Sequence, residues 1–121
     1  MTGTTLTPPV AIDRRALLAW MDGDLSLLRE LVQIFLDEAP RNLRQLRTAL
    51  TRGDANGMRL AAHTLSGNSS NFGGNAVSEL ARRLEKMGRA GDLAGVGDIL
   101  DDLEVAMDAL CRGLSDLSEH S

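Results

Sequence analysis

The stretch VGDILDDLEVAMDALCRGLSDL, residues 96–117, decides the fold class of this chain. Its large apolar residues follow one another at alternating steps of four and three: Val96, Leu100, Leu103, Met107, Leu110, Leu114 and Leu117. This spacing places them on one stripe of an α-helix and is typical of a helix packed nearly antiparallel in a bundle. A coiled-coil dimer seam is the alternative. Because the stretch has only three heptads and the chain can supply its own core, we expect a monomer.

The composition of the 121-residue chain fits one small helical domain. Hydrophobic residues make up 43% of the sequence but aromatic residues only 2%, which predicts a core of aliphatic side chains on helices. The formal net charge is −4 and the basic residues are spread along the chain, which argues against nucleic-acid binding. No apolar run approaches a membrane span and no signal peptide is recognisable, so we expect a cytoplasmic protein without a membrane partner.

Capping and turn residues divide the rest of the chain into four further helical segments. The expected segments are residues 12–21 with Asp13 as N-cap, residues 24–51, residues 54–72, and a segment that follows Gly73-Gly74-Asn75. The run Gly88-Arg89-Ala90-Gly91-Asp92 is expected to close this segment and to cap the last helix. Together they predict an all-α fold, an antiparallel up-down-up-down four-helix bundle over residues 11–117 with the short first helix covering one end. Residues 1–10, which end in Pro8-Pro9, are expected to be a disordered leader or linker, and residues 118–121, with His120, a frayed tail.

Pro40 lies inside the long segment 24–51 and removes one backbone hydrogen bond there. The competing interpretations are one kinked helix and two separate helices. We expect the kink, because the apolar stripe keeps its phase across the proline. The predicted inner face of this helix consists of Leu28, Val32, Phe35, Ala39, Leu43, Leu46 and Leu50.

The candidate functional residue is His63, in the segment 54–72. The apolar stripe of this segment consists of Met58, Ala62, Leu65, Ser69 and Phe72. His63 lies roughly 140° from the middle of that stripe, so its imidazole should project into solvent. The outward face around it is expected to carry Arg59, Leu60, Thr64, Ser66 and Gly67, with Ser70 a further turn along.

A single helical histidine is more often an ordinary solvated residue than a reactive one, and Gly67 changes that balance. Glycine costs roughly 1 kcal/mol in a helix interior relative to alanine. An exposed position offers no packing reason for that cost, whereas a missing side chain lets a bulky group reach His63. The pattern therefore favours a reactive histidine.

The run Ala62-His63-Thr64-Leu65-Ser66-Gly67-Asn68-Ser69-Ser70-Asn71-Phe72-Gly73 resembles the signature of histidine-containing phosphotransfer (HPt) domains, A-H-x-L-K-G-x-[SA]-x-x-hydrophobic-G. The downstream pattern Leu80…Leu84-Glu85 is also similar to theirs, and the resemblance extends from about Ile12 to Leu117. It implies that His63 accepts a phosphoryl group from the aspartyl phosphate of a response-regulator receiver domain and passes it to another. The implied partner is such a receiver domain, alone or within a hybrid sensor histidine kinase.

The chain departs from the HPt signature at Ser66, where the family commonly has a lysine that helps to neutralise the phosphoryl group. Arg59, on the preceding turn, is one substitute, and Gly67 and Ser70 complete the expected supporting residues. Asn68 is a milder departure. Leu60 and Thr64 are expected to contact the partner, Leu60 as an exposed apolar side chain unless the short first helix covers it.

The sequence contains no recognisable nucleotide-binding loop, so we expect a phosphotransfer intermediate and not an enzyme with its own kinase site. It also shows no carboxylate cluster near His63 to hold a metal, since the nearest acids in the sequence are Asp54 and Glu79. We therefore expect no cofactor here and magnesium on the receiver partner. The alternatives are a receiver- or kinase-docking module without transfer, then a structural bundle, then a metal or cofactor bundle. Cys111, the one cysteine, is expected to serve packing.

Overall fold

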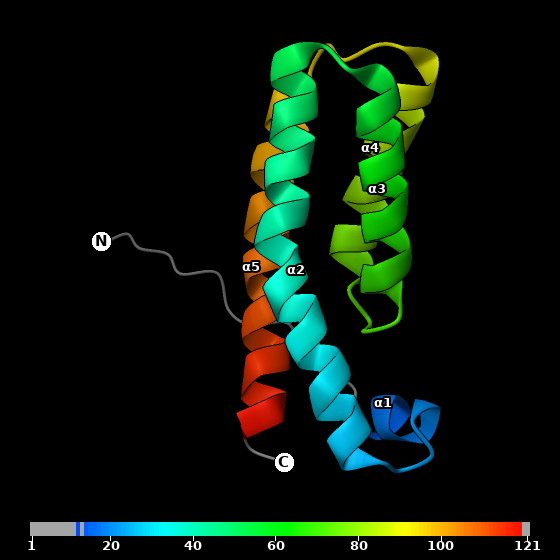
Figure 1. Cartoon of the computed structure of the whole chain (residues 1–121), viewed down its shortest axis with the longest axis vertical. Coiled ribbons are helices and arrows are strands. Elements are labelled where there is room, and N and C mark those ends of the chain that lie inside the picture. The colour runs from blue at the N-terminus through cyan, green and yellow to red at the C-terminus, as the bar shows by residue number, and fades with distance from the viewer. Residues whose placement is uncertain (1–11, 13, 120–121) are drawn as a thin grey trace, which may run out of the picture.

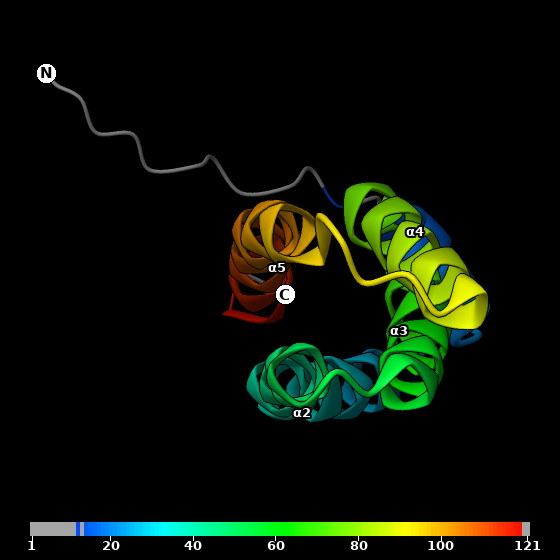
Figure 2. The ribbon, with the colours of Figure 1, turned by 90° about the horizontal axis from the view of Figure 1, so that it is seen from above.

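Five helices make up the part of the chain that the computed structural model describes, residue 12 and residues 14–119. They are α1 (Arg14–Trp20), α2 (Leu25–Arg52), α3 (Ala55–Ser70), α4 (Asn75–Ala90) and α5 (Val96–Glu119). Helices α2 to α5 alternate in direction (Figure 1), and each packs against its two neighbours in a closed ring, seen from above in Figure 2. The predicted four-helix bundle is confirmed, with α1 lying beneath the ends of α3 and α4.

Local capping interactions set the ends of the helices at the expected residues. The Asp24 carboxylate accepts a hydrogen bond from the Leu27 amide (3.0 Å), and the Asp54 carboxylate accepts one from the Gly57 amide (2.8 Å). Gly53 closes α2 in the left-handed conformation, with φ 64°, which glycine adopts without steric cost. The turn from α2 into α3 is therefore short, and the two helices are antiparallel neighbours as predicted.

Helix α2 is one helix of 28 residues with Pro40 inside it, which confirms the prediction of a single helix. Figure 1 shows its N-terminal part leaning away from α5 toward α1. The buried positions of α2 are Leu28, Val32, Phe35, Ala39, Asn42, Leu46 and Ala49. They follow a regular four-three alternation, the repeat that keeps one stripe of a long helix on its neighbours in a bundle. The expected Leu43 and Leu50 are therefore only half-buried, and Asn42 and Ala49 take the inner positions.

The helices α3 and α4 form the most closely packed pair in the bundle, and at Gly88 their backbones come close together. A Cβ atom at this buried residue would lie 2.7 Å from the Ala55 carbonyl oxygen and 2.8 Å from the Arg59 amide nitrogen. The helix ends within the expected run, residues 88–92, since α4 continues to Ala90 and Gly91 caps it with φ 72°. Gly88 itself permits the close approach of the two backbones.

The two ends of α5 differ from the predictions. The Asp92 carboxylate accepts a hydrogen bond from the Ala94 amide (3.0 Å) and does not cap α5, which begins at Val96. Helix α5 continues to Glu119, so residues 118 and 119 are helical and not a frayed tail. The expected leader over residues 1–10, the Asp13 cap and His120 lie outside the described residues. None of the helices in the described part is both long and apolar enough to cross a membrane.

Candidate functional site

His63 projects from the middle of α3 into solvent, with 73% of its side chain exposed. The opposite face of the same helix is anchored in the core, where Met58, Ala62 and Leu65 are fully buried. Ser69 and Phe72 are also buried, so the predicted stripe is confirmed along its whole length. A rigid helix therefore presents the imidazole at the surface of the bundle, as the spacing of the apolar residues predicts.

Glu85 of α4 fixes the orientation of the His63 ring. Its Oε2 atom lies 3.2 Å from His63 Nδ1 and also accepts a hydrogen bond from the Arg89 guanidinium (2.9 Å). Only 15% of the Glu85 side chain is exposed, so the carboxylate is held in place beneath the ring. A carboxylate accepts a hydrogen bond from the protonated ring nitrogen, which makes Nδ1 the N–H and leaves the Nε2 lone pair free.

Sequence reasoning missed this contact. It identified Asp54 and Glu79 as the nearest acids, whereas Glu85 lies 22 residues after His63 and reaches it only through the packing of α4 on α3. The one indication in the sequence was the pattern Leu84-Glu85. Because Leu84 is buried, its position determines on which face of α4 the next residue, Glu85, lies.

The surface beside His63 is open, as expected. A Cβ atom added at Gly67 would meet no atom within 4 Å. Leu60 is 51% exposed, and α1 does not cover it, since Trp20 of α1 instead packs edge-on against Phe72 at the far end of α3, with ring centroids 6.0 Å apart. Thr64 is exposed next to His63, with its hydroxyl donating to the Leu60 carbonyl (3.2 Å).

Ser66 does not lie on the outward face, so this prediction is wrong. It is only 8% exposed and turns toward α4, because the close approach of α4 buries a broader face of α3 than the apolar stripe indicates. The Ser66 carbonyl accepts hydrogen bonds from the hydroxyls of Ser70 (2.9 Å) and Ser78 (3.2 Å). Ser78 also lies 2.9 Å from the hydroxyls of Ser69 and Ser70. Ser66 and Ser70 thus belong to a network that joins α3 to α4.

Two guanidinium groups lie within about one turn of the site. Arg59, half-buried on α3, donates to the side-chain carbonyl of Asn56 (2.8 Å), which is neutral. Arg89 on α4 is paired with Glu85, so its charge is already balanced. No group of three or more His, Cys, Asp or Glu side chains in the described part of the chain is arranged to hold a metal ion.

Cys111 is half-buried on α5, away from this site in the sequence. Burial raises the pKa of its thiol to about 11, with a smaller contribution from the nearby Asp108 carboxylate. The thiol is therefore protonated at neutral pH and is a poor nucleophile. This agrees with the expected packing role.

Comparison with known proteins shows the family and the fold to which this chain is similar. A family model described as the Hpt domain matches residues 30–113. The fold is similar to the crystal structure of histidine-containing phosphotransfer protein B (HptB) from Pseudomonas aeruginosa PAO1, with a TM-score of 0.83, 24% sequence identity, and coverage of 91% of this chain and 96% of that one. A search of curated proteins found no match.

Proposed function

The chain belongs to the Hpt domain family and has a histidine phosphotransfer role, and from this premise we propose that His63 relays a phosphoryl group between receiver domains. The observation that carries the proposal is the His63 ring itself, 73% exposed and held at Nδ1 by Glu85. The side chain thus combines an accessible nucleophilic nitrogen, Nε2, with a fixed orientation.

The transfer step follows from this geometry. The Nε2 lone pair attacks the phosphorus of an aspartyl phosphate on the receiver, a P–N bond forms, and the acyl P–O bond breaks to leave a free carboxylate on the partner. The Nδ1 proton stays in place, so the phosphorylated ring carries a positive charge that the Glu85 carboxylate stabilises. Transfer to a second receiver is the reverse of the same step. On this proposal the receiver supplies the aspartate, magnesium and its own lysine.

Glu85 is accordingly a positioning residue, and the substitution Glu85→Gln tests whether its charge contributes to transfer. The amide still fits the site but carries no charge to stabilise the phosphorylated ring, so we expect transfer to His63 to slow about tenfold, or about 1.4 kcal/mol. Rapid-quench kinetics measures the rate, and ¹⁵N chemical shifts of the ring report whether Nδ1 still carries the proton. Glu79→Gln, on the exposed face of α4, is the matched control. An unchanged rate together with an unchanged tautomer would remove Glu85 from the mechanism.

We propose Arg59 as the cation that this domain brings to the phosphoryl group in place of the family lysine. Its partner Asn56 is neutral, whereas the charge of Arg89 is balanced by Glu85. Arg59→Ala should slow phosphorylation about fivefold, the size of effect that a partly exposed charge pair supports. Asn56→Ala is the control, because it releases the guanidinium without removing it. Equal rates for Arg59→Ala and the wild type would exclude Arg59.

The docking surface proposed for the receiver includes exposed apolar residues on the same side of the bundle. Leu60 lies one turn before His63, and Trp20 and Ile34 are about half exposed near the start of the bundle. A hollow of about 300 Å³ lies between α1, α2 and α3, lined by these two residues together with Asn42, Thr64 and Phe72. Exposed apolar side chains around a hollow are typical of transient protein interfaces.

One experiment distinguishes the proposed relay from its closest alternative, a docking module that binds a receiver without phosphoryl transfer. The protein is incubated with receiver domains of the source genome, each loaded with phosphate and magnesium, and is then examined for acid-labile, alkali-stable phosphate. Label supports the relay. Tight receiver binding without label supports the docking module. If the protein shows no receiver binding and no label, both hypotheses are contradicted.

A further inference from the structure

We propose that a basic groove between α2 and α3 binds an acidic surface segment of the receiver domain and so selects which receivers reach His63. This inference rests on the proposed function and adds a specificity site to it. The groove, called here the arginine groove, has a volume of about 730 Å³ and is lined by Arg41, Arg44 and Arg52 of α2 and by Leu60 and Thr64 of α3.

The three arginines of the groove have no charged partner within the described part of the chain. None of them makes an ion pair or a side-chain hydrogen bond there. Arg47, which points from α2 toward α5, shows the contrast, because it binds both Asp101 (3.0 Å) and Glu104 (2.8 Å). Of these four arginines of α2, the fold therefore pairs only Arg47. Arg44 and Arg52 also border the hollow that contains Glu104, but they have no charged partner in the described part of the chain.

The local charge of the arginine groove is opposite to that of the whole chain. Asp54 is the one acid among the lining residues, and its Oδ1 already accepts the hydrogen bond that caps α3. Three guanidinium groups against one carboxylate leave an excess of two positive charges, in a chain whose net charge is −4. The three share one face of α2, because Arg44 and Arg52 follow Arg41 by about one and three helical turns, and the fold places that face beside α3. Such a patch attracts an acidic partner.

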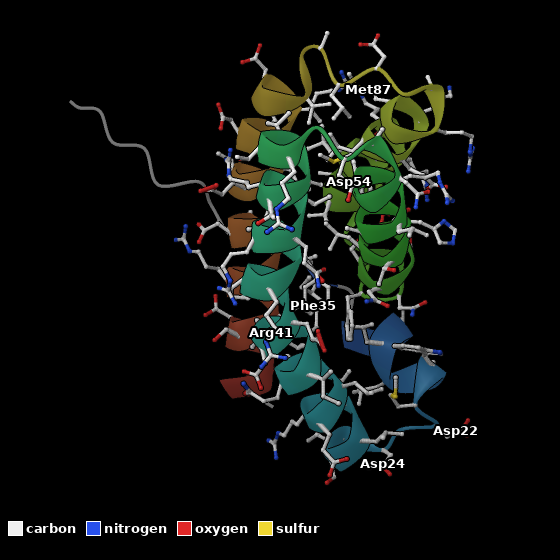
Figure 3. The ribbon with its side chains drawn as sticks, turned by 45° about the horizontal axis from the view of Figure 1, so that its top comes forward. Asp22, Asp24, Phe35, Arg41, Asp54 and Met87 are labelled. Atoms are coloured by element: carbon white, nitrogen blue, oxygen red, sulfur yellow. The ribbon has the colours of Figure 1, made fainter. Side chains whose placement is uncertain are left out.

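The groove is continuous with the phosphotransfer site. From Arg41 to Arg52 it extends about 16 Å along α2, enough for about five residues of extended chain. Leu60 and Thr64, which form its α3 wall, directly flank His63 on the helix surface. Figure 3 labels Arg41 on α2 and Asp54 at the start of α3, and both residues line the groove.

The position of the arginine groove beside His63 indicates which protein binds in it. A partner that delivers a phosphoryl group to Nε2 must lie over α3 at His63, and a standard interface covers about 800 Å² on each side, which reaches into the groove. The receiver is thus the protein whose surface meets the three arginines. Guanidinium groups bind carboxylates with two parallel hydrogen bonds, so the match specifies geometry as well as charge. Charge complementarity of this kind acts mainly on encounter and partner choice.

The test compares two double charge reversals of equal size. Arg41→Glu with Arg44→Glu changes the groove, and Arg83→Glu with Lys86→Glu changes the exposed outer face of α4. The substrate is whichever phosphorylated receiver labels the wild type fastest. We expect the groove variant to raise KM at least about tenfold with kcat unchanged, and to lose most of the salt dependence of kcat/KM between low and physiological salt. The α4 variant should stay within about twofold of the wild type.

Each outcome of this test is decisive. Equal KM values and equal salt dependence for the groove variant and the wild type would overturn the inference while leaving the relay intact. An equal loss in the α4 variant would also overturn it, because the effect would then be one of net charge. A wild type that no receiver labels would overturn the relay and the groove together. Should the groove variant unfold, the milder Arg41→Gln with Arg44→Gln is measured in its place, with an expected KM increase of about threefold.

Discussion

His63→Gln is expected to abolish phosphoryl acceptance, a loss on the order of a thousandfold or more, because the amide offers no nucleophilic lone pair on nitrogen. The fold should be unaffected. The ring is 73% exposed and Glu85 is the one side-chain partner that it has among the described residues. Substitutions at such surface positions usually change stability by less than about 0.5 kcal/mol. Radiolabel transfer from a phosphorylated receiver measures the first effect and thermal unfolding the second.

This variant also distinguishes chemistry from binding. Because Leu60, Thr64 and the arginine groove are retained, His63→Gln should bind the receiver as well as the wild type does. Acid-labile phosphate on the glutamine variant would show that another residue is the acceptor. Loss of receiver binding together with loss of label would instead show that the imidazole is part of the docking surface.

Gly88→Ala is expected to lower the free energy of unfolding by about 2 kcal/mol. Helix propensity alone would favour alanine by roughly 1 kcal/mol. The added methyl group, however, would lie 2.7 Å from the Ala55 carbonyl oxygen and 3.0 Å from Arg59 Cα. These are backbone atoms of α3, so relief requires moving α3 away from α4, and overpacking of this kind costs about 1–3 kcal/mol or more. The steric cost therefore exceeds the gain in propensity, as denaturant unfolding will measure.

Gly67→Ala is the matched control on the partner helix. Nothing lies within 4 Å of its added Cβ, so only the propensity gain remains and the protein should be stabilised by about 0.5–1 kcal/mol. We therefore expect the free energy of unfolding to fall for Gly88→Ala and to rise for Gly67→Ala. Equal stabilisation by both would show that α3 and α4 do not approach closely at Gly88. Since Gly67 borders His63, its alanine variant should also slow transfer from the receiver although it is more stable.

The elements that the sequence predicts well depend on neighbours along the chain. Asp24, Gly53 and Asp54 act through hydrogen bonds or dihedral angles within a few residues, so the ends of α2 and α3 follow from local chemistry. The exposure of His63 follows for the same reason, because one helix with a clear apolar stripe determines which of its faces is buried.

The predictions failed where another helix decides the outcome. Position 42 of α2 is buried although it carries an asparagine, since the bundle repeat and not residue hydrophobicity selects the inner positions. Ser66 is buried for a related reason, because α4 packs against a second face of α3 there and the Ser78 hydroxyl donates to the Ser66 carbonyl (3.2 Å). Spacing within one helix carries no information on how close its neighbour comes.

The sequence by itself determined the all-α bundle, the capped ends of α2 and the start of α3, and the presentation of one histidine on the surface, because these depend on periodicity and capping over short distances. Only the tertiary structure decided that Glu85 orients the His63 ring and that three arginines with no charged partner border the same surface. Both arrangements join residues of different helices, and their distances depend on how closely the helices pack and in which register.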